Sequence, residues 1–332
     1  MIGFLILSLG KIVVVFGCLM LTVAYMTWVE RKVISDFQVR LGPTRVGPFG
    51  LLQPIADGIK LFFKEDLIPS QADRTIFLLA PALSLTPALI SFAVIPFGET
   101  TTLFGLLPQP VGMVITDINV GVLYIFAVSS LGVYGIVLAG WASNSKYALL
   151  GGLRASAQMI SYELSMGLSI LGVVMMAGSL SLVDIVKAQG ELGVWFIVPQ
   201  VLGFCIFFVC ALAETNRAPF DLPEAETELV AGFHVEYSSM KFAMFFMAEY
   251  ANMITAAALA TTLFLGGWRG PFLPPLVWFL LKVFAVLYVF IWFRATLPRF
   301  RYDQLMAFGW KRLLPLALLN ALLTAAVLVS IS

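Results

Sequence analysis

The chain has 332 residues, of which 60% are hydrophobic and 12% charged, with a formal net charge of +1 and a mean hydropathy of +0.97. Apolar runs on this scale exceed what the core of a soluble globular protein needs, and they indicate a polytopic membrane protein instead. A net charge so close to zero gives no information about partners, so only the positions of the charges are informative.

We predict a single all-α membrane domain over 1–332, with about eight transmembrane helices, because one crossing takes about 20 apolar residues. The predicted crossings are 3–29, 76–97, 119–141, 155–178, 192–213, 240–266, 273–293 and 312–331. The first run is expected to be a retained helix, since it continues into charged residues without the small-residue pattern of a signal-peptide cleavage site. An even number of crossings places both termini on one side.

The positive charges predict the orientation. The segments 30–75, 142–154, 214–239 and 294–311, with Lys241 and Arg312 beside them, contain 16 of the 20 Lys and Arg residues. Short loops rich in Lys and Arg remain on the cytoplasmic side of a membrane. We therefore expect these four loops to face the cytoplasm, or the matrix of an organelle, with both termini on the opposite side.

The first of these loops is expected to be structured. In "GLLQPIADGIKLFFKED", residues 50–66, apolar residues recur at near-helical spacing opposite polar ones, and the stretch is too short to span a bilayer. This pattern predicts an amphipathic helix lying at the membrane interface. The preceding "RLGPTRVGPFG" predicts a rigid turn that holds Arg40 and Arg45 near the membrane surface.

Two acids fall deep inside predicted crossings. Glu163 and Glu249 each lie about nine residues into an apolar run, or about 13 Å at 1.5 Å per residue. An acid at that depth costs about 2.5–3.5 kcal/mol, so we expect it to face the bundle interior, a polar cavity or a proton path. The alternative is a protonated Glu that only hydrogen-bonds a neighbouring helix. Lys282, also inside a run, is expected to pair with an acid or to snorkel.

Further acids crowd the stretch "ALAETNRAPFDLPEAETELVAGFHVE", residues 211–236. Asp221, Glu224 and Glu226 are explained by a helix start near Pro223, but Glu214, Glu228 and Glu236 are not. At about 6 Å and an effective dielectric of about 20, two carboxylates repel by about 3 kcal/mol. We therefore predict a coupled, proton-handling cluster, with a solvated acidic face as the alternative.

The histidine and cysteine residues, which are the usual metal ligands, give no indication of a metal site. His234 is the only histidine, and it is either a polar loop residue or a proton shuttle. Cys18, Cys205 and Cys210 lie in apolar runs without the spacing of a zinc or iron–sulfur site, and we expect them to pack as buried thiols.

Four segments together resemble the quinone-chamber membrane subunit of respiratory complex I, which is the H-subunit family of NADH:quinone oxidoreductase. They are "ERKVISDFQVRLGPTRVGPFGLLQPIADGIKLFFKE", "GGLRASAQMISYE", "ALAETNRAPFDLPEAETELVAGFHVEYSSMKFAMFFMAEYANM" and "RATLPRFRYDQLM". The resemblance extends from about Trp28 to Trp310. It implies a proton-pumping complex in which this chain forms part of the quinone-binding chamber and couples quinone reduction to proton transfer through buried carboxylates.

The resemblance also implies roles for particular residues. The proton-relay candidates are Glu163, Glu214, Asp221, Glu224, Glu226, Glu228, Glu236 and Glu249. The residues implied to line the quinone tunnel or contact the peripheral arm are Glu30, Arg31, Arg40, Arg45 and Asp57. A basic segment implied to dock on that arm, or on anionic lipid, contains Arg294, Arg299 and Arg301.

The implied substrate is quinone, and the chain itself is expected to bind no cofactor, because FMN and the iron–sulfur clusters would be in partner subunits. The implied partners are the peripheral-arm subunits at the quinone site, which carry the terminal cluster, the small and antiporter-like membrane subunits, and lipid; no nucleic acid is expected. The implied location is the bacterial plasma membrane, with the mitochondrial inner membrane as the alternative.

Three alternatives remain open at this point. The first is a homologous subunit of a complex that takes electrons from ferredoxin, a deazaflavin or hydrogen. The second is a free-standing ion transporter, which predicts internal symmetry and activity in isolation. The third is a passive membrane anchor, for which the buried acids would be dispensable.

Overall fold

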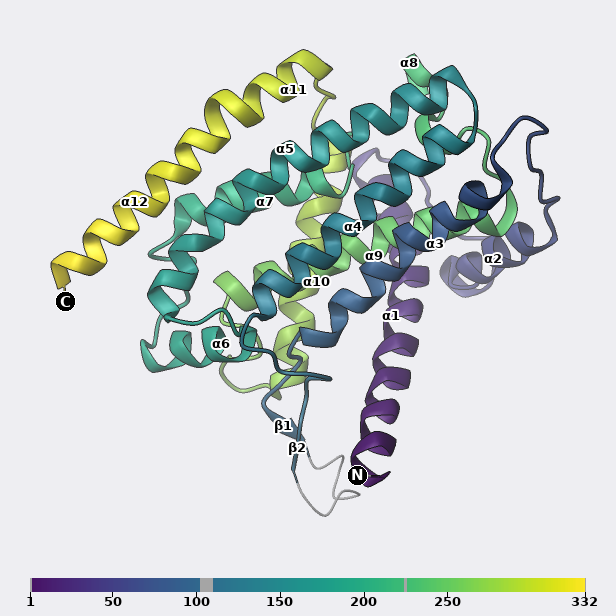
Figure 1. The fold of residues 1–332 in the computed structure, drawn as a ribbon. Coiled ribbons are helices and arrows are strands. Elements are labelled where there is room, and N and C mark those ends of the chain that lie inside the picture. The colour runs from purple at the N-terminus through teal and green to yellow at the C-terminus, as the bar shows by residue number, and fades with distance from the viewer. Residues whose placement is uncertain (1, 102–109, 224–225, 332) are drawn as a thin grey trace.

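The computed structural model describes residues 2–101, 110–223 and 226–331, and its regular structure is almost entirely helical (Figure 1). The longer helices are α1 (Ile2–Phe37), α2 (Gln53–Phe63), α3 (Arg74–Ile90), α4 (Gly121–Ala142), α5 (Lys146–Ala177), α6 (Leu182–Glu191), α7 (Val201–Glu214), α9 (Ser239–Phe264), α10 (Pro275–Thr296) and α12 (Leu314–Ile331). Shorter elements are α8 (Glu226–Leu229), α11 (Tyr302–Phe308), the 3-10 turns η1 (Pro48–Gly50), η2 (Ser91–Val94) and η3 (Gly232–His234), and the π-helical turn η4 (Gly309–Leu313). Strands β1 (Thr100–Thr101) and β2 (Val111–Gly112) form one antiparallel pair.

The all-α polytopic fold is confirmed. Within the described ranges, seven helices are long and apolar enough to cross a membrane: α1, α3, α4, α5, α9, α10 and the continuous run from α11 to α12. The prediction of about eight crossings is close, and α7 accounts for the difference because its 14 residues extend only about 21 Å, less than the roughly 30 Å of a hydrocarbon core.

Several helix ends differ from the predicted ones. Helix α1 continues to Phe37, so Glu30 and Arg31 are helical and do not belong to the loop that was expected to begin there. Helix α5 begins at Lys146, well before the predicted residue 155. The segment predicted as 192–213 is divided into a turn and α7, and the separate helix α6 precedes it. Hydropathy detects only the apolar part of a helix, whereas the backbone hydrogen bonds continue into the polar region.

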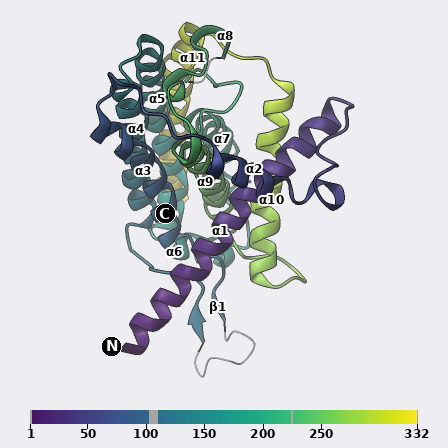
Figure 2. The same cartoon turned by 90° about the vertical axis from the view of Figure 1, so that its right-hand side faces the viewer.

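The arrangement makes α9 the centre of the bundle and leaves α1 at its edge. In the most hydrophobic 18-residue window, 61% of the residues of α9 are buried but only 11% of those of α1. Helices α3, α4, α5 and α7 pack one against the next, and α3, α7 and α10 also contact α9. Helix α12 lies against α5, on the side of the molecule away from α1 (Figures 1 and 2). Side chains on α9 therefore face neighbours on several sides.

Glycine permits one of the closest approaches in this bundle. A Cβ on Gly135 of α4 would lie 2.7 Å from the backbone nitrogen of Ser84 and 2.9 Å from the carbonyl oxygen of Ala80, both on α3. Helix α3 begins at Asp73, whose side chain accepts hydrogen bonds from the backbone N–H groups of Thr75 and Ile76. The cap and the close approach together define the position of α3 along α4.

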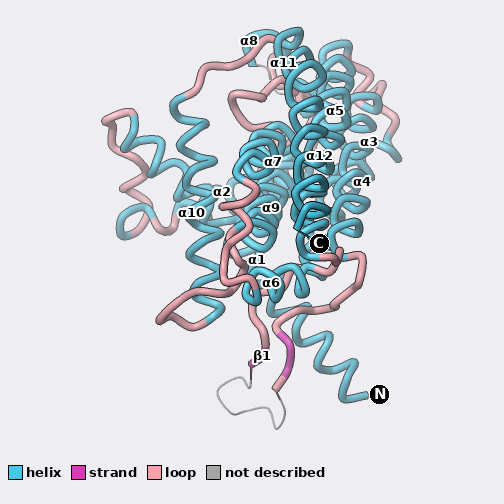
Figure 3. Tube along the Cα trace, turned by 90° about the vertical axis from the view of Figure 1, so that its left-hand side faces the viewer, coloured by secondary structure: helices cyan, strands magenta, loops and turns pink. Residues whose placement is uncertain are grey.

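The loops gather at two ends of the bundle, as Figure 3 shows. One end carries α8 and α11, and the other carries α6, the β1–β2 pair and the N-terminus. Helix α2 also belongs to the first end, where Ser239 donates a hydrogen bond to the carbonyl oxygen of Leu61 at 3.0 Å.

The amphipathic helix predicted in the first loop is present as α2. It has no buried residue, and Ile55, Ile59 and Phe62 are more than half exposed. The turn before it depends on glycine, because Gly50 has a φ of +79° and a Cβ there would lie 2.2 Å from the carbonyl oxygen of Pro43. The polar side of α2 is joined to α1 by the ion pair between Asp57 and Arg31 at 2.7 Å.

Candidate functional site

A buried ionic cluster joins four segments that are far apart in the sequence. Its centre is Glu30, whose side chain is only 4% exposed. Both carboxylate oxygens lie 2.7 Å from Nη1 of Arg217, and Oε2 accepts a hydrogen bond of 2.7 Å from the hydroxyl of Tyr250. Arg294 also forms an ion pair with Glu30. Helices α1, α9 and α10 and the segment after α7 thus meet at one carboxylate.

The guanidinium of Arg217 connects this centre to a second acid. Its Nε lies 2.5 Å from Oε1 of Glu249, and its Cζ lies 4.4 Å from the ring centroid of Tyr250. A buried arginine with two carboxylates and an aromatic face is a compensated arrangement, because an unpaired buried charge would be expensive. Any change in charge next to Arg217 therefore acts directly on Glu249.

Gln158 of α5 holds the segment that carries Arg217. The side chain is fully buried, and its Nε2 donates to the carbonyl oxygens of Ala213 at 2.7 Å and Phe220 at 2.8 Å. Nε2 also lies 3.3 Å from Oδ1 of Asn216. One amide thus ties both ends of residues 213–220 to α5, which defines the position of Arg217 between them.

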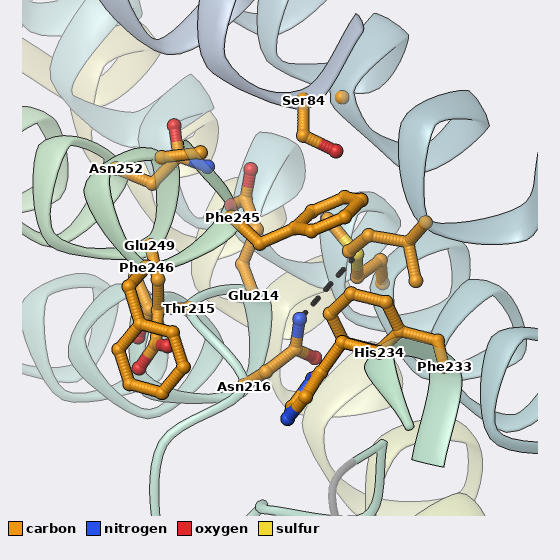
Figure 4. A pocket seen from close by; sticks show the side chains of 14 residues that line it. Ser84, Glu214, Thr215, Asn216, Phe233, His234, Phe245, Phe246, Glu249 and Asn252 are labelled. Carbon is orange, nitrogen blue, oxygen red and sulfur yellow. Dashed lines mark hydrogen bonds between the residues drawn. The ribbon is translucent and has the colours of Figure 1, made fainter. Parts of the chain in front are cut away.

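A cleft lies on the other side of Glu249. Its empty volume is about 570 Å³, and its lining includes Glu214, Asn216, His234, Glu249 and Asn252 together with several aromatic rings (Figure 4). Glu249 therefore belongs both to the ionic cluster and to the wall of this cleft. The cleft is partly open to its surroundings and has room for water-sized molecules.

A second cleft, with an empty volume of about 390 Å³, shares Glu214, Thr215 and Asn252 with the first. The Glu214 carboxyl also interacts with the hydroxyl of Ser129 and with the charge of Glu163. Glu163 in turn accepts a hydrogen bond from Ser130 on α4. The structure thus brings together the predicted acids Glu163, Glu214 and Glu249.

The other predicted acids lie closer to the loops. Asp221 is close enough to Glu249 for their charges to interact, and its carbonyl oxygen accepts a hydrogen bond of 2.7 Å from Arg299. Glu228 is about half exposed and pairs with Arg154 at 2.6 Å, and Glu236 is half-buried. The predicted acid Glu224 lies outside the described residues, and of Glu226 only the backbone, in α8, is described.

The residues predicted for the tunnel divide into two groups. Glu30 is buried at the centre of the ionic cluster, whereas Arg40 and Arg45 are exposed in the turn before α2. Arg31 and Asp57 form the pair that joins α1 to α2. The structure therefore does not unite these five residues in one cluster.

The predicted basic segment has internal partners. Arg294 pairs with Glu30, and Arg299 hydrogen-bonds the backbone of Asp221. Arg301 is exposed and pairs with Asp303 at 2.6 Å.

Lys282 has a different role from the predicted pairing with an acid. Its Nζ donates to three backbone carbonyl oxygens, those of Leu265 at 2.6 Å, Gly267 at 3.0 Å and Arg269 at 2.6 Å. The ammonium group also lies 4.5 Å from the ring centroid of Trp195. These acceptors all belong to the segment between α9 and α10, so Lys282 braces that turn, away from the acid cluster.

His234 lies in the loop between α7 and α9, in the turn η3, and its side chain is buried there. The ring lies against Phe233, Phe242 and Phe246, and burial holds the pKa of His234 at about 4, below its ordinary value of 6.5. The imidazole is therefore neutral at neutral pH, and it faces the first cleft without carrying a charge.

The site residues that were not predicted include Arg217, Ser130, Gln158, Tyr250 and Asn252. Asn252 had a usable signal, since it lies three residues after Glu249 and therefore on the same helix face. The others had none, because their importance comes from contacts between distant segments. Across the described ranges, no group of three or more His, Cys, Asp or Glu side chains is arranged to hold a metal ion.

Comparison with known proteins gives one consistent result. Residues 10–325 match the family model described as NADH dehydrogenase. The chain is 61% identical to an H subunit of NADH-quinone oxidoreductase from Geobacter sulfurreducens, over 96% of this chain and 94% of the relative. It is 57% identical to an H subunit of the same enzyme from Syntrophobacter fumaroxidans (98% and 96% covered) and 55% identical to that of Paramagnetospirillum magneticum (98% and 93% covered).

Proposed function

The chain belongs to the H-subunit family of NADH-quinone oxidoreductase, as a membrane subunit of this proton-pumping complex, and from that premise we propose that its buried acids couple quinone reduction to proton transfer. The observation that carries the proposal is the continuity from Glu30 through Arg217 to Glu249, and from there along the first cleft to Glu214. Glu163 follows Glu214 in this series, and Ser130 donates a hydrogen bond to Glu163.

The proposed chemistry follows from the substrate. Reduction of a quinone to a quinol takes two electrons and two protons, and the electrons come from the partner subunits that carry the redox centres. The chamber would lie against the ionic cluster, where Glu30, Arg217 and Arg294 present charged groups. As the quinone gains electrons, the negative charge acts on Arg217 and changes how strongly it holds Glu249, which alters the proton affinity of that acid.

The acids then act as a relay. Glu249 faces the first cleft, and water in that cleft would carry a proton between Glu249 and Glu214. Glu163 lies close enough to Glu214 for its charge to act on that carboxyl, so it is the next acid along the relay. We assign the relay to Glu163, Glu214 and Glu249, with Asp221 supporting Glu249.

Near the loops, Glu228 is exposed and Glu236 half-buried, and both would lie where the relay meets partner subunits. The roles of Glu224 and Glu226 in the relay stay predictions. The exposed arginines Arg40, Arg45 and Arg301 are suited to contacts with the peripheral arm or with anionic lipid. The proposed location is the bacterial plasma membrane, with the four Lys- and Arg-rich loops on the cytoplasmic side.

The test uses the assembled complex in inverted membrane vesicles. Glu214→Gln preserves the shape of the side chain but removes its ionisable proton, and we expect NADH-driven proton pumping to fall by at least about tenfold. Glu191→Gln is the matched control, because Glu191 is exposed at the end of α6 and is not one of the relay candidates. Pumping at the wild-type level by assembled complex carrying Glu214→Gln would contradict the proposal.

The alternatives have no supporting observation. The relatives are named as subunits of NADH-quinone oxidoreductase, which favours neither a free-standing ion transporter nor a complex with another electron donor. A passive anchor would leave pumping intact in Glu214→Gln and in Glu249→Gln, so the same vesicle assay tests it.

A further inference from the structure

Two clefts inside the bundle meet at the same three residues. Glu214, Thr215 and Asn252 line both of them, whereas the rest of each lining differs. The first cleft also has Glu249, Asn216 and His234 among its polar residues. The second has Ser129 and Thr255, and its other walls are apolar. A proton that moves from Glu249 toward the second cleft therefore has to pass this shared wall.

The hydroxyl groups that line the second cleft already donate their hydrogens to other groups of the protein. Thr215 donates to the carbonyl oxygens of Ala211 at 3.0 Å and Leu212 at 3.2 Å, both in its own helix. Thr255 likewise donates to the backbone of α9 at 3.0 Å, and the hydroxyl of Ser129 lies between the backbone of α4, at 3.1 Å, and the carboxyl of Glu214. These hydroxyls can accept hydrogen bonds, but they have no hydrogen to offer a water molecule.

Asn252 differs from these residues. Its side chain is half-buried, and within the described part of the chain no side chain or backbone group hydrogen-bonds its amide. An amide has two N–H donors and one acceptor oxygen, and in the interior of a membrane protein these groups need partners. In Figure 4 the Asn252 amide points toward the carboxyl of Glu214. Water held in the clefts is the partner that this geometry favours.

The spacing along α9 fits such a bridge. Asn252 follows Glu249 by three residues, so both lie on one face of the helix with a rise of about 4.5 Å between them. Two hydrogen bonds through one water molecule span about 5.5 Å, twice the usual length of a single bond. An amide at this position can hold one water molecule toward Glu249 and another toward Glu214, although it cannot itself take up a proton.

We propose that Asn252, together with the acceptor oxygen of Thr215, holds the water that connects Glu249 to Glu214, and so controls proton passage between the two clefts. This inference rests on the proposed relay function and adds a positioning residue to it. Asn252 donates to the water oxygens and thereby orients their hydrogens toward the carboxylates, while Glu249 and Glu214 exchange the proton. No bond other than O–H bonds forms or breaks.

The test compares three variants in assembled complex, again in inverted vesicles, with proton pumping and NADH oxidation measured together. Asn252→Leu keeps the branched shape without polar groups, and we expect pumping per NADH oxidised to fall about tenfold, which corresponds to the loss of roughly one hydrogen bond to the connecting water. Asn252→Ser leaves a polar group and more room for water, so it should retain about half of the pumping or more. Thr262→Val is the control on the same helix, because the hydroxyl of Thr262 donates only to Ala258 and Leu259 of α9.

The outcomes separate this inference from the proposed function. If Glu214→Gln abolishes pumping and Asn252→Leu does not, the relay stands and the role of Asn252 is refuted. If Asn252→Ser loses as much as Asn252→Leu, the residue acts through packing, and the inference is also refuted. If both Glu214→Gln and Asn252→Leu pump normally, the proposed function itself is wrong. A loss in Asn252→Leu that Asn252→Ser restores, with Thr262→Val unaffected, supports the inference.

Discussion

Glu30 and Arg217 are separated by 187 residues in the chain, yet two hydrogen bonds of 2.7 Å join them in the interior. Both side chains are only 4% exposed. The pair links the first helix to the segment after α7, and Arg217 extends the link to Glu249. Three distant parts of the chain are therefore held together by charge.

Replacing Arg217 leaves two acids without their shared partner. Removing one side of a buried ion pair costs about 3–5 kcal/mol, because the remaining charge is uncompensated. We therefore expect Arg217→Met to lower strongly the amount of assembled complex, as measured on native gels. The double variant Arg217→Met with Glu249→Gln should recover part of it, because Glu30 keeps its ion pair with Arg294 and the uncompensated charge of Glu249 is then gone.

The control for this experiment is Arg154→Met, which breaks the exposed pair with Glu228. An exposed pair contributes about 0–1 kcal/mol, so the complex should assemble normally. Equal amounts of complex for Arg217→Met and Arg154→Met would refute the view that the buried cluster stabilises the fold.

Gly151 of α5 lies directly against the turn that carries His234. A Cβ on Gly151 would be 2.7 Å from both the Cα of Gly232 and the backbone nitrogen of Phe233. Gly151→Ala is expected to displace η3 and to cost about 1–3 kcal/mol, as overpacking does. The readouts are the thermal inactivation temperature and the quinone reductase activity of the assembled complex.

Gly167 is the matched control on the same helix, because nothing lies within 4 Å of a Cβ built there. Alanine is favoured over glycine in a helix by about 0.5–1 kcal/mol, so Gly167→Ala should leave stability unchanged or raise it. The packing argument fails if the two alanine variants behave alike.

His234 predicts a pH dependence of stability. Its pKa in the folded protein is about 4, compared with an ordinary value of 6.5, so the unfolded chain binds more protons between these two values. The contribution of the neutral His234 side chain to the free energy of unfolding is therefore complete above pH 6.5. It is lost as the pH falls toward 4, and the total loss is about 3 kcal/mol.

The measurement is the inactivation temperature of the complex between pH 4 and pH 8, for wild type and for His234→Gln. Partner subunits contribute titrations of their own, so the informative quantity is the difference between the two curves. That difference should change between pH 6.5 and 4 and be constant above pH 7. A constant difference over the whole range would contradict the buried, neutral histidine.

We expect that replacing Lys282 lowers the stability of the complex but leaves the number of protons pumped per NADH unchanged. Lys282→Met removes the donor for three backbone carbonyl oxygens, and each buried acceptor left without a partner costs about 1–3 kcal/mol. We expect faster thermal inactivation in detergent, while the complex that remains pumps the normal number of protons per NADH. Lys187→Met is the control, because Lys187 is about half exposed. Reduced pumping per NADH in Lys282→Met would place Lys282 in the relay after all.

The sequence determined much of the architecture by itself. The apolar runs predict the spanning helices, because a hydrocarbon layer requires a minimum length of continuous apolar helix. The alternation of apolar and polar residues in 50–66 predicts α2. The depth of Glu163 and Glu249 in their runs marked both as candidates, since an acid inside a bilayer is too costly to be accidental.

Only the tertiary structure decided which of these residues meet. Glu30 was predicted to belong to a loop at the tunnel entrance, and it lies instead on α1 at the centre of a buried cluster. Lys282 was expected to pair with an acid or to snorkel, and it binds backbone carbonyl groups at a turn. Hydropathy and helical periodicity describe each helix alone and contain no information about its neighbours. The positions of Glu30, Arg217 and Asn252 depend on how the helices pack, and packing is a property of the whole bundle.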